Sequence, residues 1–103
     1  MSAASNVETV PGRIAISGEM TIYAATALRD ELFPFVLASK EPLQIDLSAV
    51  TALDTAGLQL LLMLKRVAQT AGIDAVLANV SLPVQDVLSL CRIDATLRTG
   101  AER

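Results

Sequence analysis

Residues 43–63 read LQIDLSAVTALDTAGLQLLLM, and the character of the sequence changes in the middle of this stretch. The segment from Leu43 to Leu47 is apolar apart from two polar residues, which is the pattern of a strand inside a sheet covered by helices. From Ala56 or Gly57 to Ala71, apolar residues recur at the spacing of a helix. The stretch therefore predicts a central strand that passes through a short turn into a helix.

Asp54 and Thr55 occupy that turn. The first turn of a helix leaves backbone N–H groups without partners and carries a partial positive charge, so it favours oxygen acceptors and anions. Either side chain can cap the helix, which stabilises it by about 1 kcal/mol. A hydroxyl at this place can also be phosphorylated, which adds roughly two negative charges. The residues alone leave capping and switching open for Thr55, and capping and partner recognition open for Asp54.

The segments on either side of this stretch are separated by proline and glycine residues. Their alternating or helical spacing of apolar residues predicts strands and helices in the order strand, strand, helix, strand, helix, strand, helix, with a possible final strand. A length of 103 residues with no linker predicts one domain over residues 1–103. Its class is α/β, with a mixed sheet of four to five strands and three to four helices packed against it. The outer segments are strands at Asn6–Val10, Arg13–Ser17 and Ile73–Ala78, helices at Ala24–Ser39 and from Pro83 to Cys91, and the possible strand at Arg92–Leu97.

Composition narrows the function classes. Hydrophobic residues make up 52% of the 103 residues and charged residues 18%, which indicates a folded domain with apolar surface left for a partner. The net charge is −3 and the basic residues are scattered, which argues against nucleic acid as a ligand. The apolar runs are too short to cross a bilayer, so we expect no direct membrane insertion and a cytoplasmic location.

The chain contains no histidine and only one cysteine, Cys91. The lack of histidine removes imidazole acid–base chemistry, imidazole metal ligands and phosphohistidine transfer. A single cysteine cannot form a disulfide within the chain, and its apolar neighbours predict an inert core residue. The sequence has no glycine-rich phosphate loop that would support a nucleotide pocket. The sequence therefore predicts no catalytic residue, no metal site and no cofactor.

Four segments of the chain resemble the STAS domains, which occur in anti-sigma-factor antagonists and in the cytoplasmic tails of sulfate transporters. The resemblance extends over nearly the whole sequence and implies a curved mixed sheet with helices against it. It also implies a binding module and not an enzyme. The segments that carry it are Ser17-Gly18-Glu19-Met20, Ile45-Asp46-Leu47-Ser48, Asp54-Thr55-Ala56-Gly57-Leu58 and Leu77-Ala78-Asn79-Val80.

In phosphorylation-regulated STAS domains the hydroxyl residue directly after the aspartate is the phosphoacceptor, and Thr55 holds that position here. The resemblance implies a module like the anti-sigma-factor antagonists, switched when a partner serine/threonine kinase of the anti-sigma type phosphorylates Thr55. Threonine in place of serine is commoner in other STAS branches, including the lipid-transport subunit of Gram-negative envelopes. The alternative is therefore a STAS subunit of an ABC-type membrane transport complex that binds the ATPase.

The predicted helix after Thr55 also suggests a docking patch. Leu62 and Met63 lie among polar residues on the face opposite the core, where they can form the apolar centre of a patch with a polar rim, unless another element covers them. No arginine or lysine adjoins Thr55, so the expected switch is repulsive. By resemblance, residues 21–23 in the loop before the first helix add rim contacts, although Thr21 can also be an ordinary cap. The candidate partner-binding residues are Thr21, Ile22, Tyr23, Asp54, Thr55, Ala56, Gln59, Leu62, Met63 and Arg66.

Overall fold

A computed structural model describes residues 6–91 of the chain, the side chain of Cys91 excepted. The expected strand at Arg92–Leu97 and the packing of Cys91 lie outside the described residues. Within them, four strands and three helices confirm the predicted α/β class. Their order is β1 (Val7–Val10), β2 (Arg13–Met20), α1 (Ile22–Ala38), β3 (Leu43–Leu53), α2 (Thr55–Thr70), β4 (Ala75–Val80) and α3 (Leu82–Cys91).

The sheet is mixed, with the strand order β1-β2-β3-β4. The strands β1 and β2 pair antiparallel through a two-residue connection, in which Gly12 has a φ of 83°. Pro11 followed by a glycine with positive φ is typical of a type II turn. The pairs β2–β3 and β3–β4 are parallel. The strand β3 lies between β2 and β4, which confirms the predicted central strand, and it runs well past Leu47.

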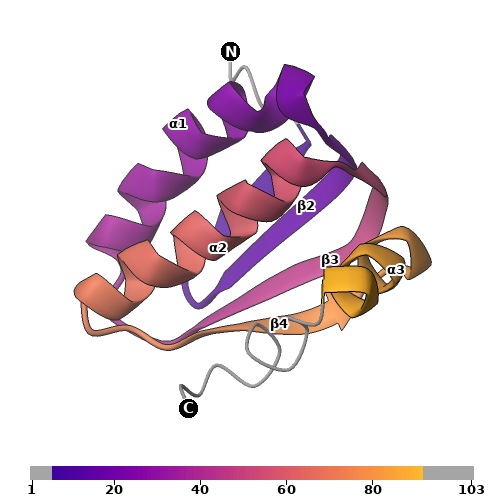
Figure 1. The fold of residues 1–103 in the computed structure, drawn as a ribbon. Helices are drawn as coiled ribbons and strands as arrows, with labels where there is room; N and C mark the ends of the chain where they lie inside the picture. Colours follow the sequence, from indigo (N-terminus) through magenta and orange to yellow (C-terminus); the bar gives the residue numbers. More distant parts are fainter. Residues whose placement is uncertain (1–5, 92–103) are drawn as a thin grey trace.

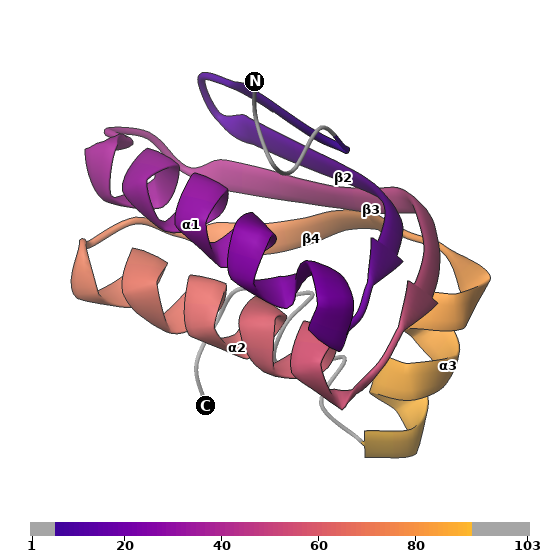
Figure 2. The same ribbon diagram turned by 90° about the horizontal axis from the view of Figure 1, so that it is seen from above.

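The parallel strands determine where the two long helices lie. A connection between neighbouring parallel strands is almost always right-handed. Because the order advances in one direction from β2 to β4, the two connecting helices fall on the same face of the sheet and run parallel to each other. Figures 1 and 2 show α1 and α2 side by side across that face. Both helices therefore begin at the same end of the sheet, where β2 and β3 end.

The core lies between this face of the sheet and the helices. Alternate residues of β2 and β3 point toward the helices, as the period of two along a strand requires. The helices meet them with apolar residues at helical spacing. Helix α3 lies beside the carboxyl ends of β3 and β4 and adds two residues to the same core (Figure 1). The buried residues at the centre include Ile14, Ile16, Leu28, Leu32, Ile45, Leu47, Leu61, Leu64, Val84 and Leu88.

Two local features differ from the sequence expectation, and a third, the burial of a lysine, has no expectation to compare with. Helix α1 begins at Ile22 and not at Ala24, so Ile22 and Tyr23 lie in the first helical turn and not in a preceding loop. Strand β2 continues to Met20 through a shift in its pairing register with β3. Lys65 is only 7% exposed, and its Nζ donates to the carbonyl oxygen of Ala75 at 2.9 Å. None of the described helices combines the length and apolar character that a membrane span requires.

Candidate functional site

The carboxylate of Asp54 links the starts of both long helices. Its Oδ1 accepts a hydrogen bond from the backbone N–H of Gly57 at 3.0 Å, which caps α2. Its Oδ2 accepts from the backbone N–H of Ile22 at 2.9 Å, at the first residue of α1. One side chain thus satisfies unpartnered donors of two helices. This geometry explains why α1 begins earlier than its apolar spacing predicts.

Thr21 stands at the N-cap position of α1, but its hydroxyl makes no capping hydrogen bond. Its Oγ1 is buried without a hydrogen-bond partner in the described part of the chain. The expectation that Thr21 is an ordinary helix cap is therefore wrong for its side chain. The backbone N–H of Ala24, a donor that such a cap would accept from, instead bonds to the carbonyl oxygen of Thr21 at 2.9 Å.

The pKa of Asp54 lies below its usual value because the hydrogen bond from the Gly57 amide stabilises the charged form, with a second contribution from the Ile22 amide. The carboxylate is therefore ionised at neutral pH. A negative group at the start of two helices also interacts favourably with both helix dipoles. Asp54 thus has a structural role as a cap, whatever it contributes to recognition.

Gly57 allows α2 to approach the end of β2. A Cβ at this position would lie 2.0 Å from the carbonyl oxygen of Met20 and 2.7 Å from Cδ1 of Leu53. Neither distance is compatible with a real side chain, so only glycine fits unless the helix moves. The Asp-Thr-Ala-Gly segment therefore combines two structural requirements, an acceptor at the N-cap and a missing side chain three residues later.

Thr55 is the first residue of α2, and it is exposed. Because Asp54 is the cap, Thr55 is not needed for capping. Residues three and four apart lie on the same face of a helix, so Thr55, Gln59, Leu62 and Arg66 form one stripe along α2. All four residues are exposed. The stripe leads from the threonine hydroxyl along the outer face of α2.

Leu62 and Met63 are 40% and 45% exposed, so no described element covers them. The alternative that they are buried under another element is wrong for the part of the chain that the structure describes. Ile22 and Tyr23 add apolar surface at the start of α1, and Tyr23 is 94% exposed. The fold thus brings the two groups of candidate residues to neighbouring helices. Ala56, next to Thr55, is half-buried between the helices.

Arg29 belongs to the same surface, although the sequence analysis did not identify it. It lines a hollow between α1 and α2 together with Thr26, Ala56, Gln59 and Met63. Its position seven residues after Ile22 places it two turns further along α1 on the same face. This spacing in the sequence could have assigned Arg29 to the same face of α1 as Ile22. The proximity of Arg29 to α2 follows only from the parallel packing of the two helices.

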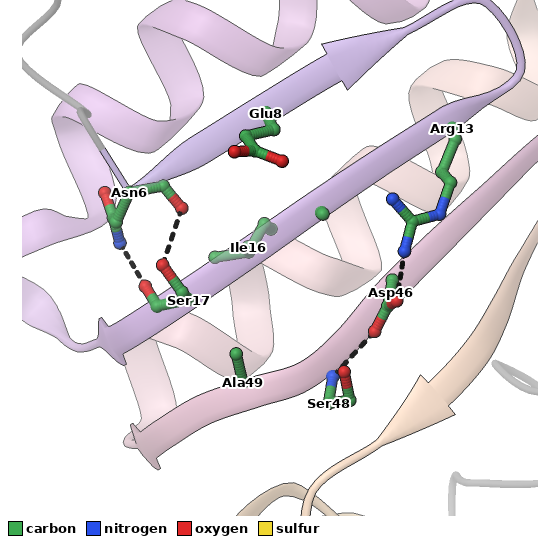
Figure 3. Close-up of a pocket in the computed structure, with 9 residues that line it drawn as sticks. Asn6, Glu8, Arg13, Ile16, Ser17, Asp46, Ser48 and Ala49 are labelled. Atoms are coloured by element: carbon green, nitrogen blue, oxygen red, sulfur yellow. Dashed lines mark hydrogen bonds and ion pairs between the residues drawn. The ribbon is translucent and has the colours of Figure 1, made fainter.

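A second hollow, of about 310 Å³, lies on the opposite face of the sheet, which no described helix covers (Figure 3). Asn6 donates to the carbonyl oxygen of Ser17, whose hydroxyl donates back to the carbonyl oxygen of Asn6 at 3.2 Å. Arg13 forms an ion pair with Asp46. These contacts join the segment before β1 to β2, and β2 to β3. Since these four residues pair with one another across the strands, we assign them a role in holding the strands together.

The pKa of Asp46 is also below its usual value. The main cause is the backbone N–H of Ser48, which donates to Oδ1 at 2.9 Å, and the charge of Arg13 contributes further. Asp46 is buried, so ionisation depends on these partners. No group of three or more cysteine or acidic side chains in residues 6–90 is placed to hold a metal ion.

Two solved structures share this fold. A candidate anti-sigma factor antagonist, tm1081, from Thermotoga maritima aligns with a TM-score of 0.67 and 19% identity, covering 89% of this chain and 81% of the other. The anti-sigma factor antagonist SpoIIAA, solved in its unphosphorylated form, aligns with a TM-score of 0.63 and 19% identity, covering 82% and 80%. At these identities the likeness concerns the fold.

The sequence itself supplies the family assignment. Residues 4–99 match the family model described as MlaB, STAS domain. The match covers the whole described fold, including the helix-capping aspartate, the exposed threonine and the glycine that the packing of α2 requires. The chain therefore belongs to the STAS domain family.

Proposed function

We propose that this protein is a cytoplasmic, non-enzymatic regulatory module, similar to the anti-sigma-factor antagonists, whose docking to a partner is switched by phosphorylation of Thr55. The partner is a serine/threonine kinase of the anti-sigma type in a bacterial signalling pathway that controls transcription. The observation that carries the proposal is the exposure of Thr55 at the start of α2. The fold shared with SpoIIAA supports the same reading.

The position of Thr55 suits a switch because the modified group and the docking patch share one helix face. The stripe from Thr55 through Gln59 and Leu62 to Arg66 is exposed over its whole length. A partner that covers Leu62 would therefore extend to within a few turns of the hydroxyl. Ile22 lies beside this point because Asp54 holds the start of α1 there.

The proposed reaction transfers the γ-phosphoryl group of ATP to Oγ1 of Thr55, which loses its proton, and ADP is released. The phosphoryl group adds between about −1.5 and −2 charges at neutral pH. These charges stand directly after the ionised Asp54. A partner that docks over this concentrated charge must remove water from it or supply a complementary positive group. Without such a group the desolvation costs free energy, so the modification opposes binding.

The test is binding to a candidate anti-sigma-type kinase, measured by isothermal titration with the full chain. We expect Thr55→Ala to bind as the wild type does, and Thr55→Glu to bind at least about tenfold more weakly. Thr70→Glu is the matched control, because Thr70 is an exposed threonine at the other end of the same helix. Incubation with kinase and ATP should place the phosphate on Thr55, as located by mass spectrometry. Equal affinity of the Thr55→Ala and Thr55→Glu variants would refute the switch.

The second candidate is a constitutive subunit of an ABC-type membrane transport complex bound to the ATPase. The threonine at position 55 favours it, since the STAS branch of lipid-transport subunits carries threonine more often than serine. In that role Thr55 is a permanent contact and not a switch. Thr55→Ala would then weaken binding to the ATPase, whereas the phosphorylation switch predicts that Thr55→Ala leaves binding to the kinase intact.

A further inference from the structure

Two shallow hollows on the outer side of α1 and α2 form one continuous surface. The first, of about 150 Å³, lies between the helices and is lined in part by Arg29. The second, of about 230 Å³, lies over α2 and is lined by Leu62 and Arg66 among others. Both hollows are lined by Gln59 and Met63, so they adjoin along these two residues. We call this region the two-hollow surface.

The charge of the two-hollow surface is opposite to that of the whole protein. Its lining residues include two arginines and no aspartate or glutamate. The chain as a whole has 11 acidic and 8 basic residues, and residues 55–70 of α2 contain no acidic residue at all. A positive region on a protein of net charge −3 orients an approaching negative surface toward itself.

Both arginines have donors to offer a partner. Arg66 is exposed and makes no ion pair within the described part of the chain. Arg29 contacts the carboxylate of Asp30 at 3.5 Å, and both side chains are about half-exposed or more. An exposed pair of this kind contributes little and leaves most of the five guanidinium N–H donors available. Arg29 lines the first hollow and Arg66 lines the second, so the two arginines flank the apolar centre formed by Leu62 and Met63.

We infer that the two-hollow surface receives a protein whose contact patch is an apolar socket bordered by aspartate or glutamate carboxylates. The socket covers Leu62 and Met63, and the carboxylates pair with Arg29 and Arg66. This inference rests on the proposed function, because it takes docking at α2 as given and specifies the chemistry of the partner. It also predicts that phosphorylation weakens binding, because a phosphate on Thr55 would face a negatively charged partner.

The experiment places the photo-crosslinking residue p-benzoylphenylalanine at position 62 of the full chain in the cell of origin. The matched control carries it at Val10, an exposed apolar residue on β1. We expect a crosslink from position 62 alone, attached to a partner peptide with acidic residues on both sides of an apolar segment. Arg66→Glu and Arg29→Glu should each lower the yield at least about tenfold, whereas the lysine variants retain it. Thermal melting of each variant confirms that it folds.

The purified partner then provides a second measurement. Replacing one of the partner's acidic residues near the crosslink with lysine should restore the binding of the Arg66→Glu variant. A crosslink to a second copy of this chain, to a lipid, or to a peptide without acidic residues would overturn the inference, and so would an unchanged yield after charge reversal. If Arg66→Glu abolishes binding and Thr55→Glu does not, the acidic partner stands and the phosphorylation switch fails. The opposite pattern removes the acidic partner and retains the switch.

Discussion

Replacing Gly57 with alanine tests whether the close approach of α2 to β2 defines the site. On helix propensity alone, alanine in place of glycine stabilises a helix by about 1 kcal/mol. The structure predicts the reverse, because the new Cβ would lie 2.0 Å from the carbonyl oxygen of Met20. An ordinary contact begins at 3.4 Å, so the start of α2 or the end of β2 must move by more than an ångström. Only Leu53, the other close neighbour, can turn its side chain away.

Overpacking of this kind costs between about 1 and 3 kcal/mol, and a clash with backbone belongs at the upper end. After the gain in helix propensity, we expect a net loss of about 2 kcal/mol in the free energy of unfolding. For a domain of this size the melting temperature should fall by about 10 °C. Urea unfolding followed by circular dichroism measures the free energy of unfolding, and a thermal melt measures the melting temperature.

Gly72→Ala is the comparison variant. Gly72 follows α2 with a φ of 77°, and a Cβ there would meet nothing within 4 Å. Its replacement therefore introduces only backbone strain, of about 1 to 2 kcal/mol. If Gly57→Ala is as stable as the wild type or more so, the close approach does not constrain the helix, and our explanation of the glycine is wrong.

Three further predictions concern charge and packing. The helix-capping hydrogen bonds lower the pKa of Asp54, so its contribution to stability is complete above the unfolded pKa and disappears as the pH falls through the folded pKa. The difference in the free energy of unfolding between the wild type and Asp54→Asn should therefore shrink from pH 7 to pH 3. Urea titrations across this range measure it. The same sign holds for Asp46, and Arg13→Met should raise the Asp46 pKa in carboxyl NMR titration, an unchanged value arguing against the ion pair. Leu28→Ala should lower the free energy of unfolding by between about 2 and 5 kcal/mol and Leu37→Ala by less than about 0.5 kcal/mol, since only Leu28 is buried. Thermal melts measure both losses, and similar losses in the two variants would show that the core is assigned incorrectly.

The sequence was sufficient for most of the fold because the main elements have clear periodic patterns. The run from Leu43 to Leu47 predicts a central strand, and the helical spacing after Gly57 predicts α2; both are present. The start of α1 was placed two residues late because its stabilising acceptor, Asp54, comes from a distant part of the chain. Such a contact leaves no signal in local periodicity.

The candidate site was predicted only in part. Thr55 and Leu62 could be placed because they lie on one helix, where spacing alone defines the face. Arg29 was missed because its proximity to α2 depends on the packing of two helices. Lys65 was not recognised as buried, since a lysine is rarely buried and its partner is a backbone oxygen of β4. Long-range packing, and not local propensity, decides these cases.

The parallel course of α1 and α2 has a consequence for reversibility. Two partial positive charges converge where the helices begin, each favouring a nearby anion by between about 0.3 and 1 kcal/mol. These charges partly offset the repulsion between Asp54 and a negative group added at that point. In the switch that we propose, the added charge opposes docking and does not unfold the domain. On that proposal, removing the group would restore binding without unfolding or resynthesis of the protein.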